Sequence, residues 1–279
     1  MTLHHTPIDG AVMAHEERGA GTRPLVLVHG YTGFWQDFEA PLDALAAEGR
    51  VLLPDLPGHG ASDRLAPGSY TLDGLAARLG AWLEQVAGEP CDLLGHSMGG
   101  MLTLRVALER PEQVASLVLM DTAHHHLDWI RVDLLEMAAR IGREAGMDKL
   151  AAILRARSAD DPERSDADRR VEAEWGEARF WRWRDTRIEA MDPEAYDALG
   201  RAMAGAPSLA DRLAEIRCPT LVMVGREDEP FLEPSRTMAE KIPDAELAIL
   251  PGGAHQPQNE CTEAWLTALR AHLQRARSA

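Results

Sequence analysis

The chain has 279 residues, and a typical domain length of about 150 residues gives a soft expectation of two domains. A composition of 45% hydrophobic and 27% charged residues is that of a folded protein with a sizeable core. Lys and Arg total 29 against 45 Asp and Glu, so the net charge is −16. Nucleic acids and anionic membranes require a basic surface, and this balance therefore argues against both as partners.

The three cysteines, Cys91, Cys218 and Cys261, are widely spaced and include no C-x-x-C pair. This pattern is neither a disulfide framework nor a zinc site, and it favours a reducing compartment. No run reaches 18 consecutive apolar residues, and the first ten residues lack the basic and apolar parts of a signal peptide. We therefore expect a cytoplasmic, soluble protein.

In chain order, short apolar runs alternate with segments of helical periodicity. Apolar runs without alternation are typical of strands covered on both faces, as in a parallel sheet. Strands that alternate with helices form βαβ units and an open α/β sheet. A short antiparallel strand is expected first, at 11–17. The other predicted strands are 24–29, 51–53, 91–94, 114–120, 220–224 and 247–250, and the predicted helices are 38–47, 72–86, 98–110, 234–242 and 260–275.

The alternation stops between residues 124 and 212. This stretch has no β-type run and contains four of the seven tryptophans. We predict a helical lid at 124–212, inserted into an α/β core made of 1–123 and 213–279, with a mobile loop at 158–168. The alternative is a helical excursion that has no role at the functional site.

The strongest chemical signal is the G-x-S-x-G pattern of residues 95–99, centred on Ser97. It follows the predicted strand 91–94 and opens the predicted helix 98–110. In that setting the serine takes a strained backbone conformation, and Gly95 and Gly99 relieve the crowding around it. The hydroxyl is then presented at the carboxyl edge of the sheet, where open α/β sheets bind their ligands. We predict that Ser97 is a nucleophile.

A serine hydroxyl needs an adjacent base, oriented by a third group. His255 follows the predicted strand 247–250, and Asp228 follows the predicted strand 220–224. We assign His255 as general base and then acid, and Asp228 as the group that fixes the imidazole tautomer. Glu227 and Glu229, which flank Asp228, and Asp121, which follows the strand 114–120, are the alternatives for the third position.

A tetrahedral oxyanion needs two backbone N–H donors that are in place before the reaction. The residue after the nucleophile, Met98, supplies one amide. The loop after the strand 24–29 supplies the other through Tyr31, because Gly30 lets the chain turn beneath the substrate. A tight turn without a catalytic role is the alternative for this loop.

Other residues that attract attention have simpler explanations. His29, His59 and His96 lie in glycine-containing turns, where a structural role is favoured. The consecutive histidines 124–126 cannot all face one ion, so no metal site is predicted.

We expect Trp181, Trp183 and Met101 to bind an apolar or aromatic part of the substrate. For four arginines interleaved with these tryptophans a surface face is favoured over an anion-binding patch: Arg179, Arg182, Arg184 and Arg187.

Taken together, the motifs His29-Gly30, DLPGHGASD, GHSMGG, GREDEP and PGGAH resemble the α/β-hydrolase superfamily over nearly the whole chain outside the lid. The order Ser, Asp, His along the chain is also that of these enzymes. The resemblance implies an eight-stranded, mostly parallel sheet with a lid after the sixth strand, and no cofactor. Haloalkane dehalogenases and epoxide hydrolases differ, because they carry an aspartate in place of the elbow serine.

Within the superfamily, the sequence is similar to lidded carboxylesterases and lactonases. HGYTG, DLPGHG, YTL, PSLADRL and GREDEPF also look like the menaquinone-pathway synthase that eliminates pyruvate, although Met101 stands where that enzyme carries an arginine. We predict a cofactor-independent serine hydrolase acting on a small ester or lactone. The alternatives are a pyruvate-eliminating lyase, a carbon–carbon bond hydrolase or perhydrolase, and a receptor that binds a ligand without turnover. The sequence is compatible with a homodimer.

Overall fold

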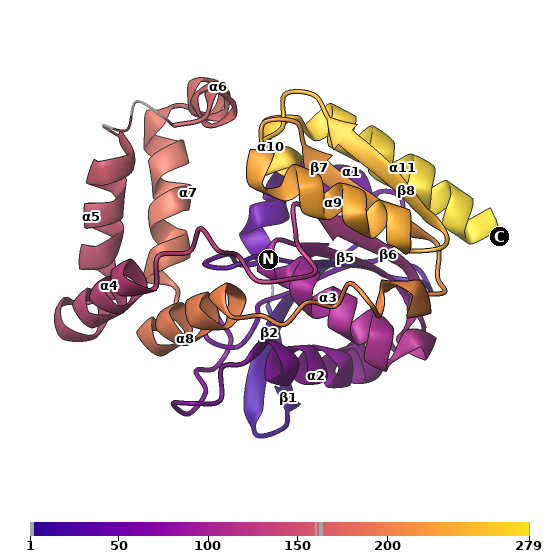
Figure 1. Ribbon diagram of the computed structural model, residues 1–279, viewed down its shortest axis with the longest axis horizontal. Coiled ribbons are helices and arrows are strands. Elements are labelled where there is room, and N and C mark those ends of the chain that lie inside the picture. Colours follow the sequence, from indigo (N-terminus) through magenta and orange to yellow (C-terminus); the bar gives the residue numbers. More distant parts are fainter. Residues whose placement is uncertain (1–2, 160, 162–163, 279) are drawn as a thin grey trace.

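An eight-stranded sheet forms the centre of the computed structural model, which describes residues 3–159, 161 and 164–278 (Figure 1). Its order is β1-β2-β4-β3-β5-β6-β7-β8, with β1 and β2 antiparallel to their neighbours and the other pairs parallel. The predicted mostly parallel sheet is confirmed. The strands are β1 (His4–Ile8), β2 (Ala11–Arg18), β3 (Leu25–Val28), β4 (Val51–Pro54), β5 (Cys91–His96), β6 (Val114–Met120), β7 (Thr220–Gly225) and β8 (Ala245–Leu250).

Helices cover both faces of the sheet, which explains the apolar strands. In β3, Val26 and Val28 face one hydrophobic core, and Leu25 and Leu27 face the other. This alternation follows from the two-residue period of a strand. The first core also receives α2 (Leu72–Trp82), α3 (Met98–Glu109) and α9 (Glu229–Lys241), and the second receives α1 (Glu39–Ala46) and α11 (Thr262–Ser278).

Several element boundaries differ from the predicted ones. The edge strand β1 was not predicted, because it is largely exposed and contains Pro7. Helix α9 begins before the predicted start and continues through Pro234. The expected helix 260–275 is divided into α10 (Pro257–Glu260) and α11, and the 3-10 turn η1 (Trp35–Phe38) precedes α1. Periodicity identifies a helix better than it locates its ends, where local hydrogen bonding decides.

Among the described residues, five α-helices lie between β6 and β7 in the chain and form what we call the helical insertion. They are α4 (Val132–Ala145), α5 (Met147–Ala159), α6 (Asp166–Trp175), α7 (Glu177–Glu189) and α8 (Pro193–Ala204). Figure 1 shows α5, α6 and α7 standing apart from the sheet, whereas α8 lies nearer to it. Of the predicted loop 158–168, residues 160, 162 and 163 lie outside the described residues. That the insertion acts as a lid stays a prediction.

The described helices include none with both the length and the apolar character that crossing a membrane requires.

Candidate active site

Ser97 lies at the sharp turn between β5 and α3. Its φ of 53° and ψ of −118° place it in a conformation that residues with a side chain rarely adopt. A Cβ atom on Gly95 would lie 2.3 Å from Thr103 Oγ1, and one on Gly99 would lie 2.4 Å from the carbonyl oxygen of His29. Only glycine fits at these two positions. The turn is therefore possible because of the two glycines of the motif.

Two hydrogen bonds hold the strained turn in place. The backbone N–H of Ser97 donates to the carbonyl oxygen of Met120 at 2.9 Å, and the Thr122 hydroxyl donates to the carbonyl oxygen of Ser97 at 2.6 Å. Both partners come from the end of the neighbouring strand β6 or the residues just after it. The position of Ser97 is therefore fixed by the sheet, which is the preorganisation that a nucleophile needs.

Three side chains from distant parts of the chain meet at the carboxyl edge of the sheet. His255 Nε2 lies 3.1 Å from Ser97 Oγ, and His255 Nδ1 lies 2.7 Å from Asp228 Oδ2. An ionised carboxylate only accepts hydrogen bonds, so Nδ1–H donates to Asp228. Nε2 is then free to accept the proton of the Ser97 hydroxyl. Of the two alternatives beside Asp228, Glu227 pairs with Arg170 and Glu229 is exposed at the start of α9.

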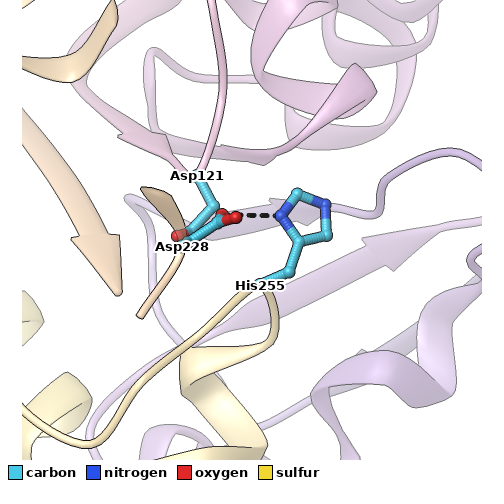
Figure 2. Close-up of side chains that lie close together, drawn as sticks. All are labelled: Asp121, Asp228 and His255. Carbon is cyan, nitrogen blue, oxygen red and sulfur yellow. Dashed lines mark hydrogen bonds and ion pairs between the residues drawn. The ribbon is translucent and has the colours of Figure 1, made fainter. Parts of the chain in front are cut away.

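A second buried carboxyl group, that of Asp121, lies beside Asp228 (Figure 2). Asp121 Oδ1 accepts a hydrogen bond of 2.9 Å from the backbone N–H of Gly225. Burial and the adjacent charge of Asp228 raise the pKa of Asp121 well above its usual range. Burial therefore favours the neutral form of Asp121. Asp228 forms the hydrogen bond to His255 that Figure 2 draws.

The same three residues are spaced closely enough to hold a metal ion, since their candidate ligand atoms all lie within 4.8 Å of one another. Asp121 Oδ1 already accepts a hydrogen bond from Gly225, and the two ring nitrogens of His255 already face Asp228 and Ser97. Hydrogen bonding therefore accounts for this cluster. In the described part of the chain, the histidines 124–126 do not form a three-ligand group.

The loop that carries His255 is held from two sides. Glu260 Oε2 accepts hydrogen bonds from the backbone N–H groups of the residues flanking His255, Ala254 at 2.6 Å and Gln256 at 3.1 Å. His96 Nε2 lies 2.7 Å from the carbonyl oxygen of His255. Burial raises the pKa of Glu260 to about 7. Glu260 was missed in the sequence, where it marked only the start of a helix; its place five residues after His255 was the available signal.

The loop after β3 approaches Ser97 closely. A Cβ atom on Gly30 would lie 2.9 Å from Ser97 Cβ, so only a glycine allows this contact. In the described part of the chain, no group accepts a hydrogen bond from the backbone N–H of Tyr31 or Met98. Both donors are therefore available, as an oxyanion site requires, and their assignment to one stays a prediction.

A cavity of about 510 Å³ opens at Ser97 and His255. One part of its wall is apolar and comes from Leu127, Trp129, Ile130, Leu135, Met203 and Phe231; another part, from α7, is polar. Of the three predicted substrate-binding residues, only Trp183 lines it. Trp181 packs against Phe180 in a separate cluster and lines a smaller cavity, and Met101 is buried in the core.

The arginines of α7 do not share one environment. Arg179 stacks on Trp175, consistent with the favoured surface position. Arg184 and Arg187 instead line the cavity. The expectation of a surface face is wrong for these two residues, because Trp183 and Arg187 contact the buried Asp37 and so turn this side of α7 toward the cavity.

The fold agrees with comparisons to known proteins. A model described as the alpha/beta hydrolase family matches residues 25–267, and the chain belongs to this family. The acetyltransferase component of an acetoin cleaving system (Pseudomonas putida) is 32% identical over 88% of this chain. The matched part of this chain covers only 62% of the length of that relative. A putative 2-succinyl-6-hydroxy-2,4-cyclohexadiene-1-carboxylate synthase (Bacillus subtilis) is 28% identical over 91% of this chain and 92% of its own length. The solved structure of a thermophilic esterase from Thermogutta terrifontis is similar with a TM-score of 0.81 at 26% identity, and the match covers 99% of each chain.

Proposed function

We propose that the protein is a serine hydrolase that cleaves carboxylic esters or lactones. The observation that carries this proposal is the continuous hydrogen-bonded series from Ser97 Oγ through His255 to Asp228, which opens on a cavity. This arrangement can deprotonate a hydroxyl at neutral pH. Membership of the hydrolase family and similarity to an esterase structure support the same class of reaction.

The geometry suits a two-step reaction. Ser97 Oγ attacks the substrate carbonyl carbon while His255 Nε2 takes its proton, and the N–H groups of Tyr31 and Met98 stabilise the resulting oxyanion. The C–O bond then breaks, and His255 returns the proton to the departing alcohol oxygen, leaving an acyl group on Ser97. Water attacks this ester as His255 removes its proton, and the acid leaves while Ser97 regains its hydrogen. With a lactone, the product is a single hydroxy acid.

A second candidate is elimination of pyruvate from a cyclohexene dicarboxylate. Similarity to the putative synthase of Bacillus subtilis favours it. In this reaction His255 and Ser97 would act together as the base, and no acyl-enzyme would form. Met101 stands where the menaquinone-pathway enzymes that the sequence resembles carry an arginine after the elbow, and this argues against it, because the cation that would bind a substrate carboxylate is missing at that position.

The test is a panel of short-chain p-nitrophenyl esters and small lactones, assayed with wild type and Ser97→Ala. We expect wild-type turnover of at least one ester and a fall of about 10³-fold or more in the variant. Turnover that survives in Ser97→Ala at the wild-type level would exclude the proposed mechanism. Pyruvate release from a 2-succinyl cyclohexene carboxylate, with no ester cleaved, would establish the second candidate instead.

A further inference from the structure

Arg187 extends from α7 into the cavity and has unused hydrogen-bonding capacity. Its side chain is 13% exposed, and its guanidinium lies 5.1 Å from the centre of the Trp183 ring. Nε is 3.4 Å from Oδ1 of the buried Asp37. Among the described residues, none accepts a hydrogen bond from Nη1 or Nη2 of Arg187. The four N–H donors of Nη1 and Nη2 therefore lack an acceptor among the described residues.

Of the two arginines in this wall, Arg187 is the one with both Nη groups lacking an acceptor among the described residues. A smaller cavity of about 210 Å³ shares Thr32, Arg184 and Arg187 with the larger one. Arg184 forms an ion pair with Asp168, whereas Arg187 pairs with the buried Asp37 through Nε and stacks on Trp183. The charge of Arg187 also acts at the elbow, because it helps burial to lower the pKa of His96, the neighbour of Ser97.

We propose that Arg187 binds a carboxylate group of the substrate, so that the preferred ester or lactone is an anion. The paired N–H groups of a guanidinium match the two oxygens of a carboxylate, which gives a short, charge-assisted contact. Asp37 neutralises part of the charge, which favours a singly charged carboxylate over a phosphate dianion. This inference rests on the proposed function, since it assigns the substrate class of the same cavity.

The apolar wall defines the rest of the substrate. Trp129 and Phe231 lie edge to face, with ring centres 5.3 Å apart, and Phe231 stacks on His255 at 5.0 Å. An apolar group of the substrate fits against this wall while its carboxylate lies at Arg187. The scissile carbonyl would then be placed between the two, at Ser97. The substrate class is an amphiphilic ester or lactone of a carboxylic acid.

A competing role for Arg187 is purely structural: it would be the counter-ion of Asp37 and attach α7 to the core. The two roles differ when Asp37 is neutralised. If Arg187 is only the counter-ion of Asp37, Asp37→Asn changes the free energy of unfolding and does not change the preference between anionic and neutral substrates. If Arg187 binds substrate, Asp37→Asn leaves its full positive charge for the ligand, and the preference for anionic substrates rises.

The experiment compares kcat/KM for two esters of similar size, p-nitrophenyl hydrogen adipate and p-nitrophenyl hexanoate. A second pair, 4-acetoxybenzoate and 4-methylphenyl acetate, places the carboxylate on the alcohol side. We expect wild type to prefer the anionic member of at least one pair. Arg187→Gln should lower that preference roughly 10- to 100-fold, Arg187→Lys should lower it less, and Asp37→Asn should raise it. Arg179→Gln, on the same helix but outside the cavity, is the matched control and should not change it.

The ratio of kcat/KM for the two esters does not change when a variant lowers both values by the same factor. If Arg187→Gln does not fold, the double variant Asp37→Asn/Arg187→Gln removes both charges and takes its place. An unchanged ratio in either variant, or no anionic preference in wild type, overturns the inference while ester hydrolysis stands. Calorimetric binding of adipate monoamide against hexanamide to Ser97→Ala tests Arg187 without turnover. Tighter binding of the monoamide that Arg187→Gln abolishes supports the anion site even if the proposed hydrolysis fails.

Discussion

Replacing Asp228 by asparagine tests which of two adjacent carboxyl groups orients His255. Asp228 Oδ2 accepts from His255 Nδ1 at 2.7 Å. An asparagine that turns its NH₂ group toward Nδ1 would instead donate, which moves the ring proton to Nε2 and removes the acceptor for the Ser97 hydroxyl. We expect kcat to fall about 10³- to 10⁴-fold, or about 4 to 5.5 kcal/mol of transition-state stabilisation.

The matched variant is Asp121→Asn. Burial and the charge of Asp228 raise the pKa of Asp121 and favour its neutral form, and an amide is neutral and has nearly the same shape as a protonated carboxyl group. Its oxygen can still accept from the N–H of Gly225. We expect a loss of less than about 10-fold. Both variants are assayed for kcat on a p-nitrophenyl ester, with thermal melting as the check on folding. A loss in Asp121→Asn as large as that in Asp228→Asn would refute this division of roles.

The remaining predictions concern the elbow and the histidine loop. Gly99→Ala brings a Cβ atom to 2.4 Å from the carbonyl oxygen of His29, so the free energy of unfolding in urea should fall by about 3 kcal/mol. The control is Gly49→Ala, which has no described atom within 4 Å of the new Cβ and should change the free energy of unfolding little. Equal effects of the two substitutions would contradict this explanation of the elbow. Glu260 has a pKa of about 7 instead of its usual 4.5, so wild type binds a proton more tightly when folded and loses about 3 kcal/mol of stability between pH 4.5 and 7. Glu260→Gln does not titrate, so its free energy of unfolding in urea should rise relative to that of wild type by about 3 kcal/mol as the pH increases from 4.5 to 7. A difference that does not vary with pH would show that Glu260 is not buried as described.

The sheet and the elbow were predictable because local patterns determine them. Apolar runs identify β3 and β5, and the glycines around Ser97 fit only one kind of turn. The carboxyl ends of parallel strands meet at one edge, so the loops carrying Asp228 and His255 had to approach Ser97.

Other features depend on packing that no local pattern encodes. The direction of Arg187 follows from how α7 lies against η1, and the contact with Asp37 joins residues 150 positions apart. The raised pKa of Asp121 comes from its burial and from the charge of Asp228 beside it, and neither can be read from the residues around position 121. The edge strand β1 is exposed along most of its length, so its sequence lacks the run of apolar residues by which the other strands were predicted.

Trapping of the acyl-enzyme tests whether Ser97 is the nucleophile. Wild type is mixed with a p-nitrophenyl ester, quenched in acid within the first turnover and analysed by intact-mass and peptide mass spectrometry. We expect one acyl group per chain, on the peptide that contains Ser97, and none in Ser97→Ala. Steady ester turnover with no acyl group on Ser97 at any quench time, or an acyl group on another residue, would contradict it.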